Sequence, residues 1–82
     1  MATYLPTLKQ LQYLAALQDH GHFGRAAEAC FVTQSTLSAG IRELETLIGV
    51  TLVERTRRVV RFTPLGDRIA DKARRVLREA DE

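Results

Sequence analysis

A run of short hydrogen-bonding side chains opens the segment Thr33 to Glu45, whose sequence is TQSTLSAGIRELE. These side chains are Thr33, Gln34, Ser35, Thr36 and Ser38. Apolar residues in the same region lie within about 60° of one another at helical spacing and predict a buried stripe. That stripe is Leu37, Ile41, Leu44 and Ile48. The polar side chains and Arg42 lie on an adjacent face, where they are either solvated or available to phosphates and base edges.

Positive charge is concentrated in residues 54–63, which contain four arginines and one acidic residue, Glu54. The arginines are Arg55, Arg57, Arg58 and Arg61. The net charge of the whole chain is only +2, so composition alone requires no polyanionic partner. A local concentration of charge can nevertheless attract one. For any single arginine, a salt bridge with Glu54 or Glu43 is the alternative.

The chain offers little for catalysis or metal binding. His20 and His22 lie two residues apart and have no further ligands at metal-binding spacing, so we expect a cap or surface role for them. We find no set of nucleophile, base and orienting group and no phosphate-binding loop, so we expect neither an enzyme nor a cofactor or metal. The single cysteine, Cys30, excludes an internal disulfide and is expected to be a small buried hydrophobe.

The composition is that of one small globular domain. The chain has 82 residues, of which 45% are hydrophobic and 27% charged. No apolar run approaches the roughly 18 residues that a membrane-spanning helix needs. We therefore expect no membrane contact, and the single cysteine fits a reducing cytoplasm.

Three helices are predicted in the first fifty residues. Thr7 and Gln10 have the spacing of a capping box, and Gly21 ends the first helix. A short alanine-rich helix follows over about residues 23–30. The third helix has Thr33 as its N-cap and Gly49 at its end. A glycine inside that helix, Gly40, predicts close packing against a neighbouring helix.

The rest of the chain predicts a hairpin and a long helix. The segments LVERT and VVRFT are rich in β-branched residues and flank Arg57-Arg58, which indicates two strands and a basic turn over about residues 52–62. Thr63-Pro64 starts the last helix, 64–82. We expect Leu65 to pack on the first helix. A coiled-coil-like stripe predicts a dimerisation surface, formed by Ile69, Ala73, Val76 and Ala80.

The predicted fold is mainly α: a winged helix-turn-helix of three helices and a two-stranded β-wing over residues 1–63, then a long linker helix. The helix-turn-helix covers about residues 23–42. The chain resembles the DNA-binding domain of LysR-type transcriptional regulators, with no C-terminal regulatory domain. The residues that carry this resemblance are F-x-R-A-A, V-T-Q-S-x-L-S, I-R-x-L-E, L-x-E-R and F-T-P-x-G. Within the family it is most similar to the OxyR-like, peroxide-responsive activators.

The resemblance implies a bacterial, cytoplasmic, nucleoid-associated homodimer that binds double-stranded DNA at an inverted-repeat operator. Its third helix would enter the major groove and its wing the neighbouring minor groove. The implied base contacts are Gln34, Ser35, Ser38 and Arg58. The implied phosphate contacts are Thr33, Thr36, Arg42, Arg55, Arg57 and Arg61. A tetramer and a contact with RNA polymerase are compatible with the resemblance in a full-length protein.

Some residues depart from the family pattern. Ser35 stands where many members have proline, Gly24 replaces a polar residue, and Ala39-Gly40 replaces longer polar side chains. These differences affect the DNA sequence that is read more than the mode of binding. Two alternatives remain at this point: a LysR-type regulator that responds to a small-molecule metabolite, or a winged helix used for protein interaction.

Overall fold

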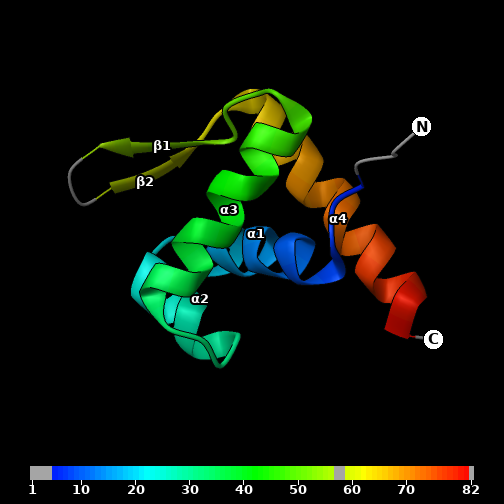
Figure 1. Ribbon diagram of the computed structural model, residues 1–82, viewed down its shortest axis with the longest axis horizontal. Coiled ribbons are helices and arrows are strands. Elements are labelled where there is room, and N and C mark those ends of the chain that lie inside the picture. The colour runs from blue at the N-terminus through cyan, green and yellow to red at the C-terminus, as the bar shows by residue number, and fades with distance from the viewer. Residues whose placement is uncertain (1–4, 57–58, 82) are drawn as a thin grey trace.

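The computed structural model describes residues 5–56 and 59–81, in which helices predominate (Figure 1). The elements are α1 (Leu8–His20), α2 (Phe23–Ala29), α3 (Gln34–Ile48), β1 (Val53–Thr56), β2 (Val59–Phe62) and α4 (Pro64–Asp81). The two strands pair antiparallel. The predicted order of three helices, hairpin and long helix is therefore confirmed. Among the described residues, no helix is both long and apolar enough to span a membrane.

Local signals in the sequence define where α1 and α3 begin and end. The Thr7 hydroxyl accepts from the Gln10 amide at 3.1 Å, and the Gln10 side chain accepts from the Thr7 amide at 3.0 Å. Gly21 and Gly49 follow the two helices with φ of 65° and 84°, a left-handed conformation that glycine adopts without strain. The predicted caps of these two helices are confirmed.

The core lies between the first three helices. Leu14 and Leu17 of α1 and three residues of the predicted α3 stripe, Leu37, Ile41 and Leu44, are fully buried. Ile48 was expected to be buried with them, but it is 37% exposed. It is the last residue of α3, directly before the Gly49 cap, so it lies at the margin of the core.

Gly40 allows α1 to lie close against α3. A Cβ atom at this position would come within 2.6 Å of Cδ2 and 2.8 Å of Cε2 of the Tyr13 ring. Real side chains do not approach so closely, so only glycine fits without displacing the ring. The close helix packing predicted from Gly40 is confirmed.

The end of the hairpin is joined to the start of α4 through Thr63. Its hydroxyl donates to the carbonyl oxygen of Thr51 at 2.9 Å and accepts from the amide of Gly66 at 2.9 Å. Gly66 lies directly against the backbone carbonyl of Leu52, which leaves no room for a side chain. These contacts give the F-T-P-x-G motif a structural explanation: it closes the hairpin and starts the last helix.

Small side chains bring α4 close to the rest of the domain. Gly66, Ala70 and Ala73 are buried, and Ala70 belongs to the main core cluster. Leu65, which was expected to pack on the first helix, is 39% exposed. The inward face of α4 therefore consists of small residues at positions 66, 70 and 73, about a quarter turn from Leu65.

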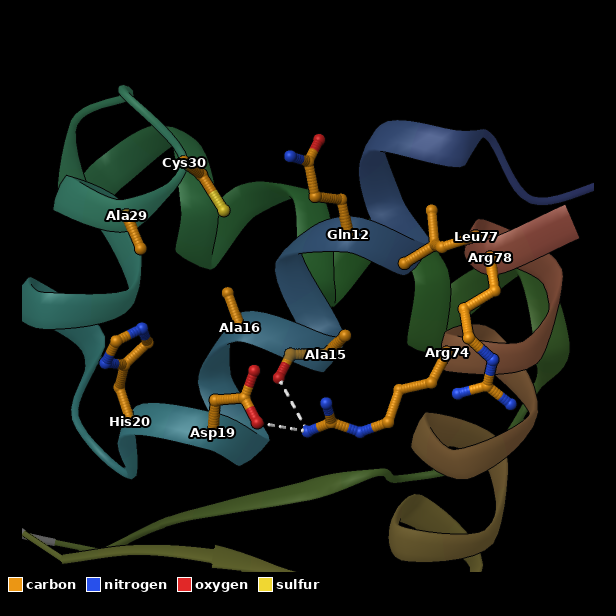
Figure 2. Close-up of a pocket in the computed structure, with 10 residues that line it drawn as sticks. All are labelled: Gln12, Ala15, Ala16, Asp19, His20, Ala29, Cys30, Arg74, Leu77 and Arg78. Atoms are coloured by element: carbon orange, nitrogen blue, oxygen red, sulfur yellow. Dashed lines mark hydrogen bonds and ion pairs between the residues drawn. The ribbon is translucent and has the colours of Figure 1, made fainter. Parts of the chain in front are cut away.

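Hydrogen bonds from Arg74 to α1, which we call the polar clamp, fix the second half of α4. The Arg74 guanidinium donates to Asp19 at 2.6 Å, to the Gln18 carboxamide oxygen at 2.9 Å and to the Ala15 carbonyl oxygen at 3.3 Å. Figure 2 shows Arg74 reaching Asp19 and Ala15 at the edge of a hollow of about 350 Å³ between α1, α2 and α4. The clamp fixes the direction in which α4 leaves the domain.

Candidate nucleic-acid interface

The first half of α3 carries an exposed polar face. Gln34, Ser35 and Arg42 are exposed and Ser38 is half-buried. Together with Ala39 they line one hollow of about 550 Å³. Three of the predicted base contacts are therefore brought together with one predicted phosphate contact, on the side of α3 away from the core.

Thr33 and Thr36 form a small hydrogen-bonded unit at the start of α3. The Thr33 hydroxyl accepts from the Thr36 amide at 3.1 Å and donates to the Thr36 hydroxyl at 2.9 Å. This arrangement uses the Thr33 oxygen for the cap and the Thr33 proton for the Thr36 hydroxyl, whereas the Thr36 hydroxyl keeps its own proton for another acceptor. Of the two predicted phosphate contacts, Thr36 has the better geometry, and both stay predictions.

The α2 helix begins with an N-cap that residue preferences alone do not identify. His22 is the N-cap, and its Nδ1 accepts from the Arg25 amide at 3.2 Å. Histidine is not among the preferred N-cap residues, so the usual signal of Ser, Thr, Asp or Asn was absent. Gln34 of α3 lies nearby, with its amide oxygen 3.6 Å from the position of a Cβ atom built on Gly24.

The arginines of the hairpin have different environments. Arg61, on β2, is exposed, as a phosphate contact requires. The predicted contacts Arg57 and Arg58 lie outside the described residues. Arg55 is half-buried: its Nη1 donates to Oε1 of Glu45 at 3.2 Å, and its guanidinium carbon lies 5.7 Å from the centre of the Phe23 ring. This geometry favours a structural role for Arg55 over the predicted phosphate contact.

Glu45 connects α3 to the wing. Besides Arg55, it accepts hydrogen bonds at Oε2 from the backbone amides of Leu52 at 2.8 Å and Val53 at 3.1 Å. The side chains of Glu45 and Arg55 are only 14% and 25% exposed. Charge-assisted hydrogen bonds in such a position are strong. They fix β1, and thus the hairpin that carries Arg61, relative to α3.

The predicted dimerisation stripe on α4 is only partly exposed. Val76 is 45% exposed and Ala80 is exposed, whereas Ile69 is partly buried against the core. Ala73 is 2% exposed and packs inside its own chain, which leaves its side chain little area for a partner. The exposed Leu65 lies on the same face as Val76, so it replaces Ala73 in the candidate stripe.

Cys30 lies beside the hollow between α1 and α4 (Figure 2). It is half-buried, and burial raises the pKa of its thiol above the ordinary value of 9.0. The thiol is therefore protonated at neutral pH, which disfavours redox reactivity. Within residues 5–56 and 59–81 no group of three or more potential metal ligands gathers.

Comparison with protein families decides the classification. The family described as "Bacterial regulatory helix-turn-helix protein, lysR family" matches residues 8–67. The chain belongs to this LysR family. It is accordingly a DNA-binding domain of the kind found in transcription regulators, and not an enzyme.

Two curated relatives in the LysR family show equal identity to the chain. The HTH-type transcriptional regulator EstR of Acinetobacter baylyi is 54% identical over 78 residues, which cover 95% of this chain and 26% of EstR. The DNA-binding transcriptional dual regulator OxyR of Escherichia coli K12 is 54% identical over 72 residues, covering 88% of this chain and 24% of OxyR. The chain thus spans about a quarter of the length of these relatives.

Solved LysR-family structures have the same fold. A full-length OxyR variant from Pseudomonas aeruginosa matches with a TM-score of 0.90 and 45% identity, covering 94% of this chain and 26% of that one. The DNA-binding domain of CbnR, solved in complex with DNA, matches with a TM-score of 0.87 and 32% identity, covering 92% of this chain and 86% of that one. The predicted winged helix-turn-helix is confirmed by these structures.

Proposed function

We propose that this LysR-family domain reads a specific double-stranded DNA sequence by placing the first half of α3 in the major groove. The exposed face of Gln34, Ser35, Ser38 and Arg42 is the observation that carries the proposal. Apart from Arg42, its side chains are short, and the major groove, about 12 Å wide, admits one helix. A glutamine can pair with adenine, and serine can serve either donors or acceptors on base edges.

The phosphate contacts of this proposal surround the base-reading face. Thr36 offers a hydroxyl proton at the start of α3, where the helix dipole also favours negative charge. Arg42 and Arg61 are exposed cations on α3 and β2. The predicted contacts of Thr33, Arg57 and Arg58 complete the set, with Arg58 in the minor groove. Arg55 is left out because Glu45 holds it inside the domain.

A homodimer on an inverted repeat is the second part of the proposal. Figure 1 shows the wing and α4 on opposite sides of the domain, so a partner on α4 leaves the wing and the α3 face accessible. The exposed stripe that includes Leu65 and Val76 supplies apolar area for that partner. Two-fold symmetry of the protein would then be matched by symmetry of the operator.

The signal to which a full-length regulator responds is not defined by its DNA-binding domain. EstR and a hydrogen peroxide-inducible genes activator of Escherichia coli are equally identical to the chain, so we keep both a response to peroxide and a response to a small-molecule metabolite as alternatives. Cys30 is unsuited to sensing because its thiol is half-buried and its pKa is raised. Any peroxide sensor would therefore lie elsewhere in a longer protein.

The exposed face of α3 also argues against a domain that binds only other proteins. Such a module would bury an apolar patch, whereas the exposed face of α3 is lined by polar side chains and Arg42.

The proposed function is tested by Ser38→Glu, which places a negative charge in the face that meets DNA. We expect affinity for duplex DNA to fall at least about 100-fold, because a carboxylate would face phosphates and base acceptors in a narrow space. Gln12→Glu is the matched control, since Gln12 is exposed on α1 beside α4. Fluorescence anisotropy and circular dichroism measure binding and fold. Equal affinity of the two variants would refute the groove model.

A further inference from the structure

The side chains of His22 and Gln34 both come close to Gly24. A Cβ atom at Gly24 would lie 3.0 Å from Cε1 and 3.3 Å from Nδ1 of the His22 imidazole. The same atom would lie 3.6 Å from the amide oxygen of Gln34. The absence of a side chain at Gly24 thus lets an imidazole from the start of α2 and a carboxamide from the start of α3 approach the same backbone position.

The α2 cap determines which nitrogen of His22 carries the proton. Nδ1 accepts the hydrogen bond of the Arg25 amide at 3.2 Å, so it must be unprotonated. In a neutral imidazole the proton then resides on Nε2, which can only donate. The donor is then Nε2, which is bonded to Cε1, the imidazole atom closest to the position of a Cβ atom on Gly24.

We propose that His22 is a positioning residue for DNA reading: its Nε2–H donates to the amide oxygen of Gln34 when α3 is seated in the groove. The inference rests on the proposed base contact of Gln34. The amide oxygen has a second lone pair for the base, while the hydrogen bond from His22 fixes which end of the carboxamide is oxygen and which is nitrogen. A hydrogen bond from a neighbouring side chain can orient a functional side chain in this way.

Fixing the carboxamide has a consequence for base choice. Adenine offers an acceptor at N7 and a donor at N6, which match one amide nitrogen and one amide oxygen. Guanine offers acceptors at both N7 and O6 and suits a carboxamide that turns its nitrogen toward O6. Because His22 holds the oxygen in place, it disfavours the turned carboxamide. His22 thus increases the preference of Gln34 for adenine over guanine.

Gly24 contributes to the same arrangement of His22 and Gln34. An alanine at this position is compatible with the helix, but its methyl group would lie 3.0 Å from Cε1 of His22, so the imidazole would have to shift. The family resemblance places a polar side chain where this chain has Gly24. We infer that glycine at this position makes room for the imidazole to orient Gln34.

The test compares His22→Asn, Gln34→Ala and the double variant with the unmodified chain. Asparagine keeps a good N-cap acceptor and removes the imidazole donor. Each protein is titrated by fluorescence anisotropy against a duplex that the unmodified chain has selected from a random pool. The titration is repeated with variants of that duplex, each of which has one base pair replaced. We expect Gln34→Ala and His22→Asn to weaken the adenine-over-guanine preference at one shared position, each by about fivefold or more. The double variant should be no worse than Gln34→Ala alone.

Gly24→Ala provides a second, independent variant. It should lower the preference at the same position while the thermal midpoint changes little, because the helix propensity of alanine offsets the weakening of the α2 cap by the shifted imidazole. A selective effect of this kind distinguishes positioning from loss of the α2 cap, which would lower stability and affinity for all duplexes alike.

Failure of the inference and failure of the proposed function give different results. If Gln34→Ala relaxes one position but neither His22→Asn nor Gly24→Ala affects that position, the positioning role is wrong and the base contact stands. If His22→Asn still weakens the preference in the Gln34→Ala background, the two residues act independently and the inference is also wrong. If Gln34→Ala changes no position, the base contact itself is refuted, and the inference with it.

Discussion

Individual side chains on α3 divide into those used by the fold and those left at the surface. The Thr33 hydroxyl is occupied by its cap and by Thr36. Arg42 is exposed, and the ion pairs found among residues 5–56 and 59–81 involve only Arg55 with Glu45 and Arg74 with Asp19. Arg42 is therefore available to neutralise a phosphate without first breaking a described salt bridge.

We predict that Arg42→Ala weakens binding to all duplexes by a similar factor and makes the binding less dependent on salt. One lost phosphate contact should reduce the slope of log affinity against log salt by about 0.9. The measurement is a series of titrations between about 0.05 and 0.2 M salt. Arg78→Ala is the control, because Arg78 is an exposed arginine on α4 beside α1. An unchanged slope for Arg42→Ala would rule out its phosphate contact.

At the scale of elements, Glu45 determines how the wing is attached to α3. It accepts from two backbone amides of the β1 region and from Arg55. Removal of its carboxylate would leave these donors without an acceptor in a largely buried position. We predict that Glu45→Ala lowers the free energy of unfolding by about 2–4 kcal/mol.

Urea unfolding followed by circular dichroism, at one protein concentration, measures this effect. The control is Glu43→Ala, since Glu43 is an exposed carboxylate on the same helix, and its effect should stay within about 0.5 kcal/mol. If both variants unfold at the same urea concentration, Glu45 does not anchor the wing.

The contact between α1 and α4 should weaken in acid. The hydrogen bond and charge of Arg74 lower the pKa of the Asp19 carboxyl below its ordinary value of 3.8. A lowered folded-state pKa stabilises the fold above the unfolded value, and this contribution is lost as the pH falls from about 3.8 through the folded value. The effect is small, because the Asp19 side chain is 56% exposed.

The difference in unfolding free energy between the unmodified chain and Asp19→Asn should therefore be present at pH 6 and shrink below pH 3.8. Urea unfolding at several pH values measures it. A difference that grows toward acid pH would contradict the assigned direction of the pKa shift.

The elements could be predicted where their signals are local. Thr7 with Gln10, Thr33 and Gly49 are recognisable caps because the interacting groups lie within a few residues of one another. The Glu45–Arg55 pair joins separate elements, and a charge pattern does not reveal which arginine turns inward. The sequence left His22 with either a cap or a surface role, because its capping contact depends on a ring geometry that residue preferences do not encode.

The faces of α4 were predicted less well than its existence. Helical spacing indicated one apolar stripe, but two faces contain small or apolar residues. The face with Gly66, Ala70 and Ala73 allows the closest approach and packs on the domain, which leaves Leu65 and Val76 outside. Which of two neighbouring stripes is buried depends on the shape of the opposing helix, which the α4 sequence alone does not contain.

At the scale of the whole molecule, the exposed stripe on α4 predicts self-association. Val76→Asp places a charge in that stripe, where the side chain is 45% exposed in the single chain. We expect it to shift sedimentation equilibrium toward monomer without unfolding the domain, and to weaken binding to a DNA with two half-sites through lost avidity. Arg78→Asp, on the other flank of α4, is the control and should leave association unchanged. Identical association of both variants would exclude this stripe as the dimer surface.

Selection of duplexes from a random pool by the unmodified chain, at about 0.15 M salt, tests the central claim most directly. The account predicts enrichment of an inverted repeat whose half-site centres lie about one helical turn, roughly 34–36 Å, or a small multiple of it apart. Such a result requires both base reading by α3 and two-fold pairing of the domain. Binding without enrichment of any sequence, or no binding at all, would contradict the account.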